Sequence, residues 1–173
     1  MYRIATVCTG NICRSPMAEL ALRRAFDRAG LADHVTVDSA GISDEEHGNP
    51  IDPRAQRLLK REGLNPHGHR AQQFTPQWFG DHDLILAMDT QHARALASMA
   101  PHDDDARGKV RMYRSFDPAV ADLPAREQGI VDPWYGNAQG FEQTWEMVTG
   151  ALDGIVEYTR HALASSAGTQ REA

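Results

Sequence analysis

The sequence predicts a single α/β domain in which a central parallel sheet of about four strands is flanked by helices. The chain has 173 residues, a length that suits one domain with a core of ordinary size. Four short apolar runs alternate along it with longer segments of helical periodicity. Because parallel strands need crossover connections, the intervening helices should cover both faces of the sheet.

Each predicted strand is a short run rich in aliphatic residues, at residues 4–7, 35–37, 84–87 and 110–112. The predicted helices follow these runs, at residues 16–29, 53–62, 90–99 and 141–163. Pro16 suits an early position of the first helix and Gly30 suits its end. The second helix is followed by Gly63, and the third ends before Pro101. The fourth repeats large apolar residues on one helical face.

Three further segments lack such patterns. Residues 101–108 carry an acidic run, which we expect to be a solvated turn rather than a metal site. Residues 117–137 are rich in Pro, Gly and Asp, and connectors of that length are often functional. Residues 165–173 have no apolar anchors, so we expect the domain to span residues 1–164 and to end in a frayed tail.

Composition excludes several classes of function. The net charge is −6 and no basic run offsets it, which argues against general nucleic-acid binding. No apolar stretch is long enough for a membrane span, and no signal segment begins the chain. We therefore expect a cytoplasmic protein without membrane association, although a leaderless export route stays open. With no long exposed apolar stripe, we expect a monomer.

The cysteines and histidines argue against a disulfide framework and against metal. The two cysteines, Cys8 and Cys13, lie in one short segment, whereas a structural disulfide normally ties distant segments. The eight histidines are scattered and show no metal-ligand spacing. We expect no metal site, and reactive chemistry explains the cysteine pair better.

Residues 8–14, Cys-Thr-Gly-Asn-Ile-Cys-Arg, lie between the first predicted strand and the first helix. A loop in that place turns backbone N–H groups inward beside the positive end of a helix, which suits a tetrahedral oxyanion. Cys8 supplies a nucleophile, favoured as a thiolate by the helix, by Arg14 and by the Ser15 hydroxyl. Arg14 supplies a forked cation for two phosphate oxygens. The loop therefore predicts a phosphate-ester hydrolase that works through a phosphocysteine.

Other members of the loop have supporting roles. Gly10 permits close backbone approach, and Asn11 tolerates left-handed backbone geometry while its amide ties the loop. Cys13 has two interpretations that stay open. It either fills space as a small side chain or captures an oxidised Cys8 as a reversible disulfide.

Residues 7–19, VCTGNICRSPMAE, resemble the signature of the low-molecular-weight protein tyrosine phosphatases, and most of all the bacterial members. Further matches follow in order along nearly the whole chain, at residues 38–41, 52–54, 69–71, 88–89 and 132–136. The resemblance implies hydrolysis of phosphotyrosine in protein substrates. No metal or organic cofactor is implied, since an arginine and the backbone do the work that Mg²⁺ does in kinases.

In that family a second loop, Asp-Pro followed by two aromatics, supplies the general acid, and the matching residue is Asp132. It would protonate the tyrosyl oxygen and later deprotonate the water that hydrolyses the phosphocysteine. Asp117 and Pro118 repeat the dipeptide, but no aromatic follows, so Asp117 is expected to start a turn. Trp134 and Tyr135 match the aromatic pair that walls the substrate cleft, with Trp where the family commonly has Tyr.

The resemblance also implies a hydrogen-bonded set around the phosphate. The residues that bind phosphate or support the loop are Thr9, Gly10, Asn11, Ile12, Cys13, Ser15, Ser39 and His69. Within this set, Ser15 would donate to the Cys8 thiolate. Asp89 matches a position linked to His69, in a supporting role.

One segment departs from the family. Residues 43–48, Ser-Asp-Glu-Glu-His-Gly, carry no aromatic where relatives usually have one opposite the acid loop. That wall of the cleft should be more acidic and less apolar. We therefore expect phosphopeptides with basic flanks to be preferred.

Three other functions on the same scaffold remain as alternatives. Protein arginine phosphatases tend to carry Thr where Ile12 stands, and an apolar Ile12 suits an aryl ring better. Thioredoxin-linked arsenate reductases need resolving cysteines downstream, and none follows Cys13. A non-catalytic phosphotyrosine-binding module would be expected to lose Cys8 or Asp132 while keeping Arg14. All three are present, which favours an active protein tyrosine phosphatase.

Overall fold

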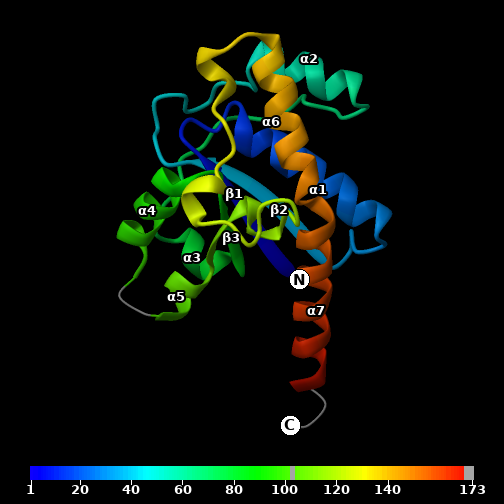
Figure 1. Cartoon of the computed structure of the whole chain (residues 1–173). Coiled ribbons are helices and arrows are strands. Elements are labelled where there is room, and N and C mark those ends of the chain that lie inside the picture. The colour runs from blue at the N-terminus through cyan, green and yellow to red at the C-terminus, as the bar shows by residue number, and fades with distance from the viewer. Residues whose placement is uncertain (102–103, 170–173) are drawn as a thin grey trace.

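The computed structural model describes residues 1–101 and 104–169 and confirms the α/β class (Figure 1). Its sheet has four strands, all parallel, in the order β2-β1-β3-β4. The strands are β1 Tyr2–Cys8, β2 Val35–Gly41, β3 Leu84–Ala87 and β4 Val110–Met112. In this register Cys8 pairs with Gly41, and Val7 pairs with Ala87. The carboxyl ends of the three strands β1, β2 and β3 thus meet at one edge, where ligands bind in such sheets.

Helices cover both faces of the sheet. They are α1 Arg14–Arg28, α2 Pro53–Arg61, α3 Trp78–Asp81, α4 Thr90–Met99, α5 Asp104–Gly108, α6 Ala138–Gly150 and α7 Leu152–Thr169. Short 3₁₀ turns occupy Tyr113–Phe116, Ala125–Glu127 and Pro133–Tyr135. Figure 1 shows α1, α6 and α7 on one side of the sheet, with α3, α4 and α5 on the other. No helix in the described part of the chain has the length and apolarity needed to cross a membrane.

Two buried clusters, one on each face of the sheet, form the core. Ile4 and Cys8 of β1 join the cluster that includes α1, α6 and α7, whereas Ala5 and Val7 join the cluster with α3 and α4. This division follows from the alternation of side chains along a strand. Cys8 therefore ends β1 on the face that α1 covers.

The C-terminal helical pattern differs from the prediction. Residues 141–163 were expected as one helix, but the chain forms α6 and α7 with a break at Ala151. Close packing accompanies the break. A Cβ on Gly154 would lie 2.1 Å from the Phe116 carbonyl oxygen, and one on Gly150 would lie 3.2 Å from an Asp117 carboxylate oxygen.

Two other segments also differ. Residues 104–108 form α5 rather than a solvated turn, and Ala106 of this helix is buried. Residues 102–103 of the acidic segment lie outside the described part of the chain. Acidic residues in its first turn suit the positive end of a helix. Helix α7 continues through Thr169, so residues 165–169 are helical. The rest of the expected tail, residues 170–173, lies outside the described residues.

Candidate active site

The loop of residues 8–14 is a tight turn between β1 and α1. Asn11 has a φ of 58°, the left-handed region that few residues other than glycine adopt. The end of β2 supports the loop from the side. A Cβ on Gly41 would lie 2.5 Å from the Thr9 carbonyl oxygen, so only glycine permits this approach. The loop is therefore held closely against the sheet.

Cys8 lies at the bottom of this turn and is 3% exposed. Its sulfur accepts the backbone N–H of Asn11 at 3.3 Å and lies 3.1 Å from the Ser15 Oγ. Ser15 Oγ also lies 3.2 Å from the Ala40 carbonyl oxygen, which accepts from the hydroxyl. An N–H donor, a hydroxyl and the first turn of a 15-residue helix surround the sulfur. The sulfur therefore lies among groups of the loop and of the helix start, at the carboxyl end of β1.

The Asn11 side chain connects the loop to its neighbours. Its Nδ2 donates to the hydroxyls of Ser15 and Ser39, both at 2.9 Å. Its Oδ1 accepts the backbone N–H of Gln72 at 3.0 Å. The ring of His69 reaches the Asn11 carbonyl oxygen, with Nε2 at 2.8 Å. The structure thus brings together Asn11, Ser15, Ser39 and His69, four members of the set that the resemblance assigned to phosphate binding or loop support.

Arg14 is 4% exposed and holds two carboxylates. Nη1 donates to Asp89 Oδ2 at 2.9 Å, and Nη2 donates to Asp132 Oδ2 at 2.7 Å. Nη2 also reaches the Thr9 hydroxyl at 3.3 Å. Residues 14 and 132, which lie far apart in the sequence, therefore meet at one guanidinium group.

The expected link between Asp89 and His69 was wrong. Asp89 caps α4 on the other side of the loop, and its Oδ1 lies 3.0 Å from Nδ1 of the buried His92. His92 Nε2 lies 2.9 Å from the Thr9 hydroxyl. Burial opposes ionisation of Asp89, but the contacts with His92 and the charge of Arg14 hold its pKa well below the ordinary range. Asp89 thus contacts Arg14 directly, and His92 contacts Asp89 and Thr9.

The acid loop, residues 132–136, contacts the phosphate loop, residues 8–14, through the ion pair of Asp132 with Arg14. Asp132 Oδ1 accepts the backbone N–H of Trp134 at 3.0 Å and so caps the 3₁₀ turn. Trp134 is 44% exposed and Tyr135 is 90% exposed, so neither ring belongs to the core. Asp117, by contrast, is buried against Arg114 and accepts the Ala119 N–H, as expected for a residue that starts a turn.

A cleft of about 250 Å³ lies between the two loops. The residues that line it are Cys8, Thr9, Gly10, Ile12, Cys13, Arg14, Glu45, Glu46, Asp132, Trp134 and Tyr135. Glu45 and Glu46 come from the segment without an aromatic, and they place two carboxylates on the cleft wall. Burial, together with the charges of Asp52, Cys8 and Asp132, raises the pKa of the Cys13 thiol, and both cysteines are free.

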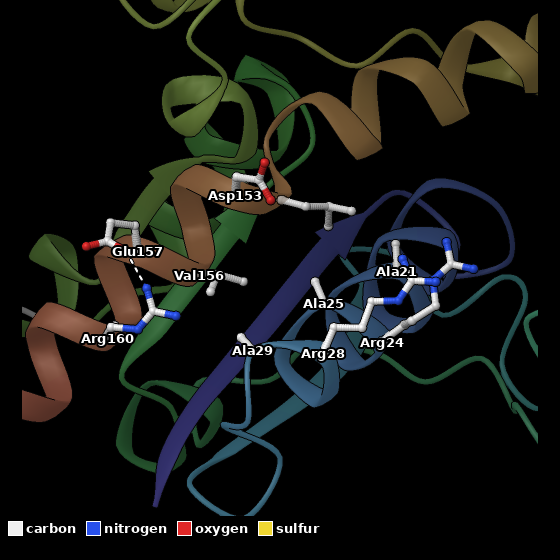
Figure 2. Close-up of a pocket in the computed structure, with 10 residues that line it drawn as sticks. Ala21, Arg24, Ala25, Arg28, Ala29, Asp153, Val156, Glu157 and Arg160 are labelled. Atoms are coloured by element: carbon white, nitrogen blue, oxygen red, sulfur yellow. Dashed lines mark hydrogen bonds and ion pairs between the residues drawn. The ribbon is translucent and has the colours of Figure 1, made fainter.

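A larger cavity, about 430 Å³, lies elsewhere, between α1 and α7. Figure 2 shows Ala21 and Ala25 of α1 and Ala29 just after it, with Val156 of α7 across from them. Its polar lining consists of arginines and carboxylates, without a nucleophile. The chemistry predicted from the sequence therefore belongs to the smaller cleft. Within residues 1–101 and 104–169, no group of three or more His, Cys, Asp or Glu side chains is arranged to hold a metal ion.

Sequence reasoning missed four residues around the site. Glu19 accepts a hydrogen bond from the Ser39 hydroxyl, and His92 contacts Thr9. Asp52 bonds the phosphate loop, and Arg54 bonds the loop that carries Asp132. A signal existed for some of them. Glu19 follows Ser15 by one helical turn on the buried face of α1, and Asp52 precedes a proline at the start of a predicted helix.

The chain is similar in sequence and in fold to known proteins. The profile of the family described as "Low molecular weight phosphotyrosine protein phosphatase" matches residues 3–167. A low molecular weight protein-tyrosine-phosphatase of Streptomyces coelicolor is 43% identical over 166 residues, which cover 96% of this chain and 98% of that protein. The solved structure of YfkJ from Bacillus subtilis matches with a TM-score of 0.84 at 31% identity, covering 94% of this chain and 96% of its own. Wzb of Vibrio vulnificus, solved in complex with benzylphosphonate, matches with a TM-score of 0.76 at 29% identity, covering 91% and 98%.

Proposed function

Because the chain belongs to the low molecular weight phosphotyrosine protein phosphatase family, and is a protein-tyrosine phosphatase, we propose that it acts through a phosphocysteine on Cys8. Arg14 binds the phosphate and Asp132 is the general acid and base. The observation that supports this assignment is the cleft itself, which has the Cys8 sulfur at its floor and the Asp132 carboxylate at its rim. Arg14, also in the lining, lies 2.7 Å from that carboxylate.

In the first step the Cys8 thiolate attacks phosphorus in line with the leaving tyrosyl oxygen. The S–P bond forms as the P–O bond breaks, and Asp132 gives its proton to the departing oxygen. The backbone N–H groups of the loop and the Arg14 fork neutralise the equatorial oxygens. In the second step Asp132 takes a proton from water, the water oxygen attacks phosphorus, and the S–P bond breaks. Inorganic phosphate leaves, and the Ser15 hydroxyl turns from the Ala40 carbonyl oxygen to donate its hydrogen to the thiolate that returns.

The ion pair between Arg14 and Asp132 changes partners during this cycle. A phosphate dianion bound by the fork competes for the Nη2 group that Asp132 accepts from. Released from Nη2, the carboxylate takes a proton from solvent water before the first step and approaches the leaving oxygen as the acid. Its other oxygen accepts the Trp134 N–H, a bond that keeps the carboxyl group at the cleft while Nη2 binds the phosphate.

The cleft wall supports an aryl phosphate as substrate. Trp134 and Tyr135 form one side, and the buried Ile12 presents an apolar surface within the lining. The benzylphosphonate in the Vibrio vulnificus structure joins a phosphonate to an aromatic group, in keeping with a cleft of this kind. Flat aromatic groups stack well on such walls.

The test compares hydrolysis of p-nitrophenyl phosphate and of a phosphotyrosine peptide by wild type, Cys8→Ser and Asp132→Ala, with a chelator present. Cys8→Ser should be inactive on both substrates. Asp132→Ala should slow the peptide most, because tyrosine is the poorer leaving group. A wild-type protein that hydrolyses neither substrate but cleaves phosphoarginine, or that binds the peptide without turnover, would overturn the proposal in favour of an alternative.

A further inference from the structure

The motif Asp52-Pro53-Arg54, at the start of α2, is bonded to both loops of the cleft. The Asp52 backbone N–H donates to the carbonyl oxygen of Ile12, in the phosphate loop, at 2.8 Å. The Arg54 guanidinium donates to carbonyl oxygens of the acid loop, to Gly136 at 3.1 Å and to Trp134 at 3.4 Å. Two adjacent groups at the start of α2 therefore bond one loop each.

The geometry of Arg54 is closely constrained. Asp52 is 7% exposed, and its carboxylate accepts Arg54 Nε at 3.1 Å and Nη2 at 3.0 Å, a bidentate pair. The same carboxylate caps α2 by accepting the Arg54 backbone N–H at 2.7 Å. Burial alone would raise the pKa of Asp52, but these bonds hold it below the ordinary range. The guanidinium also lies over the ring of Phe141 at 4.7 Å and over that of Trp134 at 5.7 Å.

Besides the ion pair of Asp132 with Arg14, the acid loop is bonded on both sides of its catalytic residue, and just before it the Ile130 N–H donates to the Met88 carbonyl oxygen at 2.8 Å. On the N-terminal side, Thr144 donates to the Val131 carbonyl oxygen at 3.1 Å. On the C-terminal side, the two carbonyls that Arg54 binds flank the end of the 3₁₀ turn that Asp132 caps. The position of the Asp132 carboxyl thus depends on contacts on both sides of it, and Arg54 provides those on the C-terminal side.

We propose that Arg54 is a positioning residue that holds the acid loop in register with the phosphate loop, through its bidentate pair with Asp52. The proposal rests on the proposed function, because register matters only if Asp132 transfers a proton. Displacement of a catalytic group by even 1 Å can cost orders of magnitude in rate. Loss of Arg54 should therefore impair proton transfer more than phosphate binding.

The experiment measures kcat and KM of Arg54→Met on a phosphotyrosine peptide and on p-nitrophenyl phosphate. The activated nitrophenyl ester needs little help from an acid, whereas the tyrosyl group needs much. We expect kcat/KM to fall about tenfold for the peptide and less than about threefold for the nitrophenyl ester. The matched control is Arg61→Met on the same helix, which breaks an ion pair with Glu142 of α6 and touches neither loop. It should leave both rates unchanged.

A second measurement separates positioning from a general loss of structure. In an Asp132→Ala background, Arg54→Met should cause no further loss on the peptide, since the group it positions is gone. Equal losses on both substrates, or a full additional loss in the double variant, would overturn the proposal. If Arg54→Met does not fold, Arg54→Lys takes its place, because lysine keeps the charge but cannot form the fork. Failure of the proposed function gives a different result, in which Asp132→Ala itself hydrolyses the peptide at the wild-type rate.

Discussion

The two loops of the cleft are built in opposite ways. In the phosphate loop, Cys8, Asn11, Arg14 and the adjacent Ser15 are each at most 4% exposed, and each side chain has hydrogen-bond partners. In the acid loop, Asp132 lies at the surface and Tyr135 is 90% exposed. The rigid, prearranged phosphate loop, which forms the floor of the cleft, suits oxyanion stabilisation, because its donors need no reorganisation during reaction. The exposed acid loop, which forms the rim of the cleft, suits contact with a protein substrate and the transfer of a proton.

Replacing the cation of the floor should have the largest effect. Arg14→Lys keeps the charge but loses the planar fork, and its ties to Asp89 and Asp132 change geometry. We expect kcat/KM to fall roughly 10²–10³-fold on both the phosphotyrosine peptide and p-nitrophenyl phosphate. Steady-state kinetics measures this, with Arg24→Lys as the control, since Arg24 on the same helix lies away from the cleft. A loss of kcat/KM on the peptide alone would contradict this prediction, because it would mean that Arg14 acts with the acid loop rather than in binding phosphate.

Side-chain hydrogen bonds that hold the floor should contribute more to the free energy of unfolding than those that hold the rim. Asn11→Ala removes the two amide donors and one acceptor and places alanine at a positive φ. We expect a loss of about 2–4 kcal/mol in the free energy of unfolding, measured by urea denaturation. The matched rim variant is Asn137→Ala, which removes the cap of α6 next to the acid loop and should cost only about 1 kcal/mol.

Asn11→Gly distinguishes the two causes of that loss. Glycine adopts the positive φ without strain but lacks the amide. If Asn11→Gly is as stable as wild type, the side-chain network contributes nothing and the floor is held by its backbone alone.

The sequence predicted the floor better than the rim and its supports. Residues of the phosphate loop lie within a few positions of one another, so their spacing alone carries the chemistry. The contacts that hold the cleft together join distant residues instead. Arg14 and Asp89 are 75 positions apart, and Arg54 and Trp134 are 80 apart. No local pattern reports such pairs, which is why Asp89 was linked to the wrong histidine and Arg54 had no role.

The same reasoning explains the fold. Strands 84–87 and 110–112 were predicted with their observed bounds, since short buried runs of aliphatic residues define them. The break between α6 and α7 was missed; residues 150 and 154 closely approach residues 116 and 117 there, a tertiary contact that no local pattern reports. Periodicity is the same on both sides of the break, and only tertiary packing reveals it.

The floor should also control stability against acid. The folded-state pKa of Asp89 is depressed, so its contribution to stability is present above the ordinary aspartate pKa and is lost as pH falls below about 4. Asp89→Asn should therefore be less stable than wild type at pH 7, and the difference should shrink toward pH 3. Urea denaturation at several pH values measures it.

An exposed carboxylate provides the control for this titration. Glu142 pairs with Arg61 at the surface, and that pair holds its pKa below the ordinary range. Exposed pairs contribute little, so Glu142→Gln should match wild type at every pH. An Asp89→Asn deficit that persists unchanged at pH 3 would mean that the side chain stabilises the floor through its shape rather than its charge.

The smallest expected effect concerns the wall of the cleft opposite the acid loop, formed by Glu45 and Glu46. Glu45 and Glu46 line the cleft, and Glu46 is steadied by Asn49 Nδ2 at 2.7 Å. A phosphopeptide with basic flanks should therefore show a higher kcat/KM than its charge-swapped acidic counterpart, by about threefold at low salt. Glu45→Gln should reduce this preference, whereas Glu62→Gln, away from the cleft, should not. Equal kcat/KM for the two peptides would show that this wall of the cleft selects peptides by shape alone. A preference that survives in high salt would mean that a buried contact is responsible, because surface attraction is screened there.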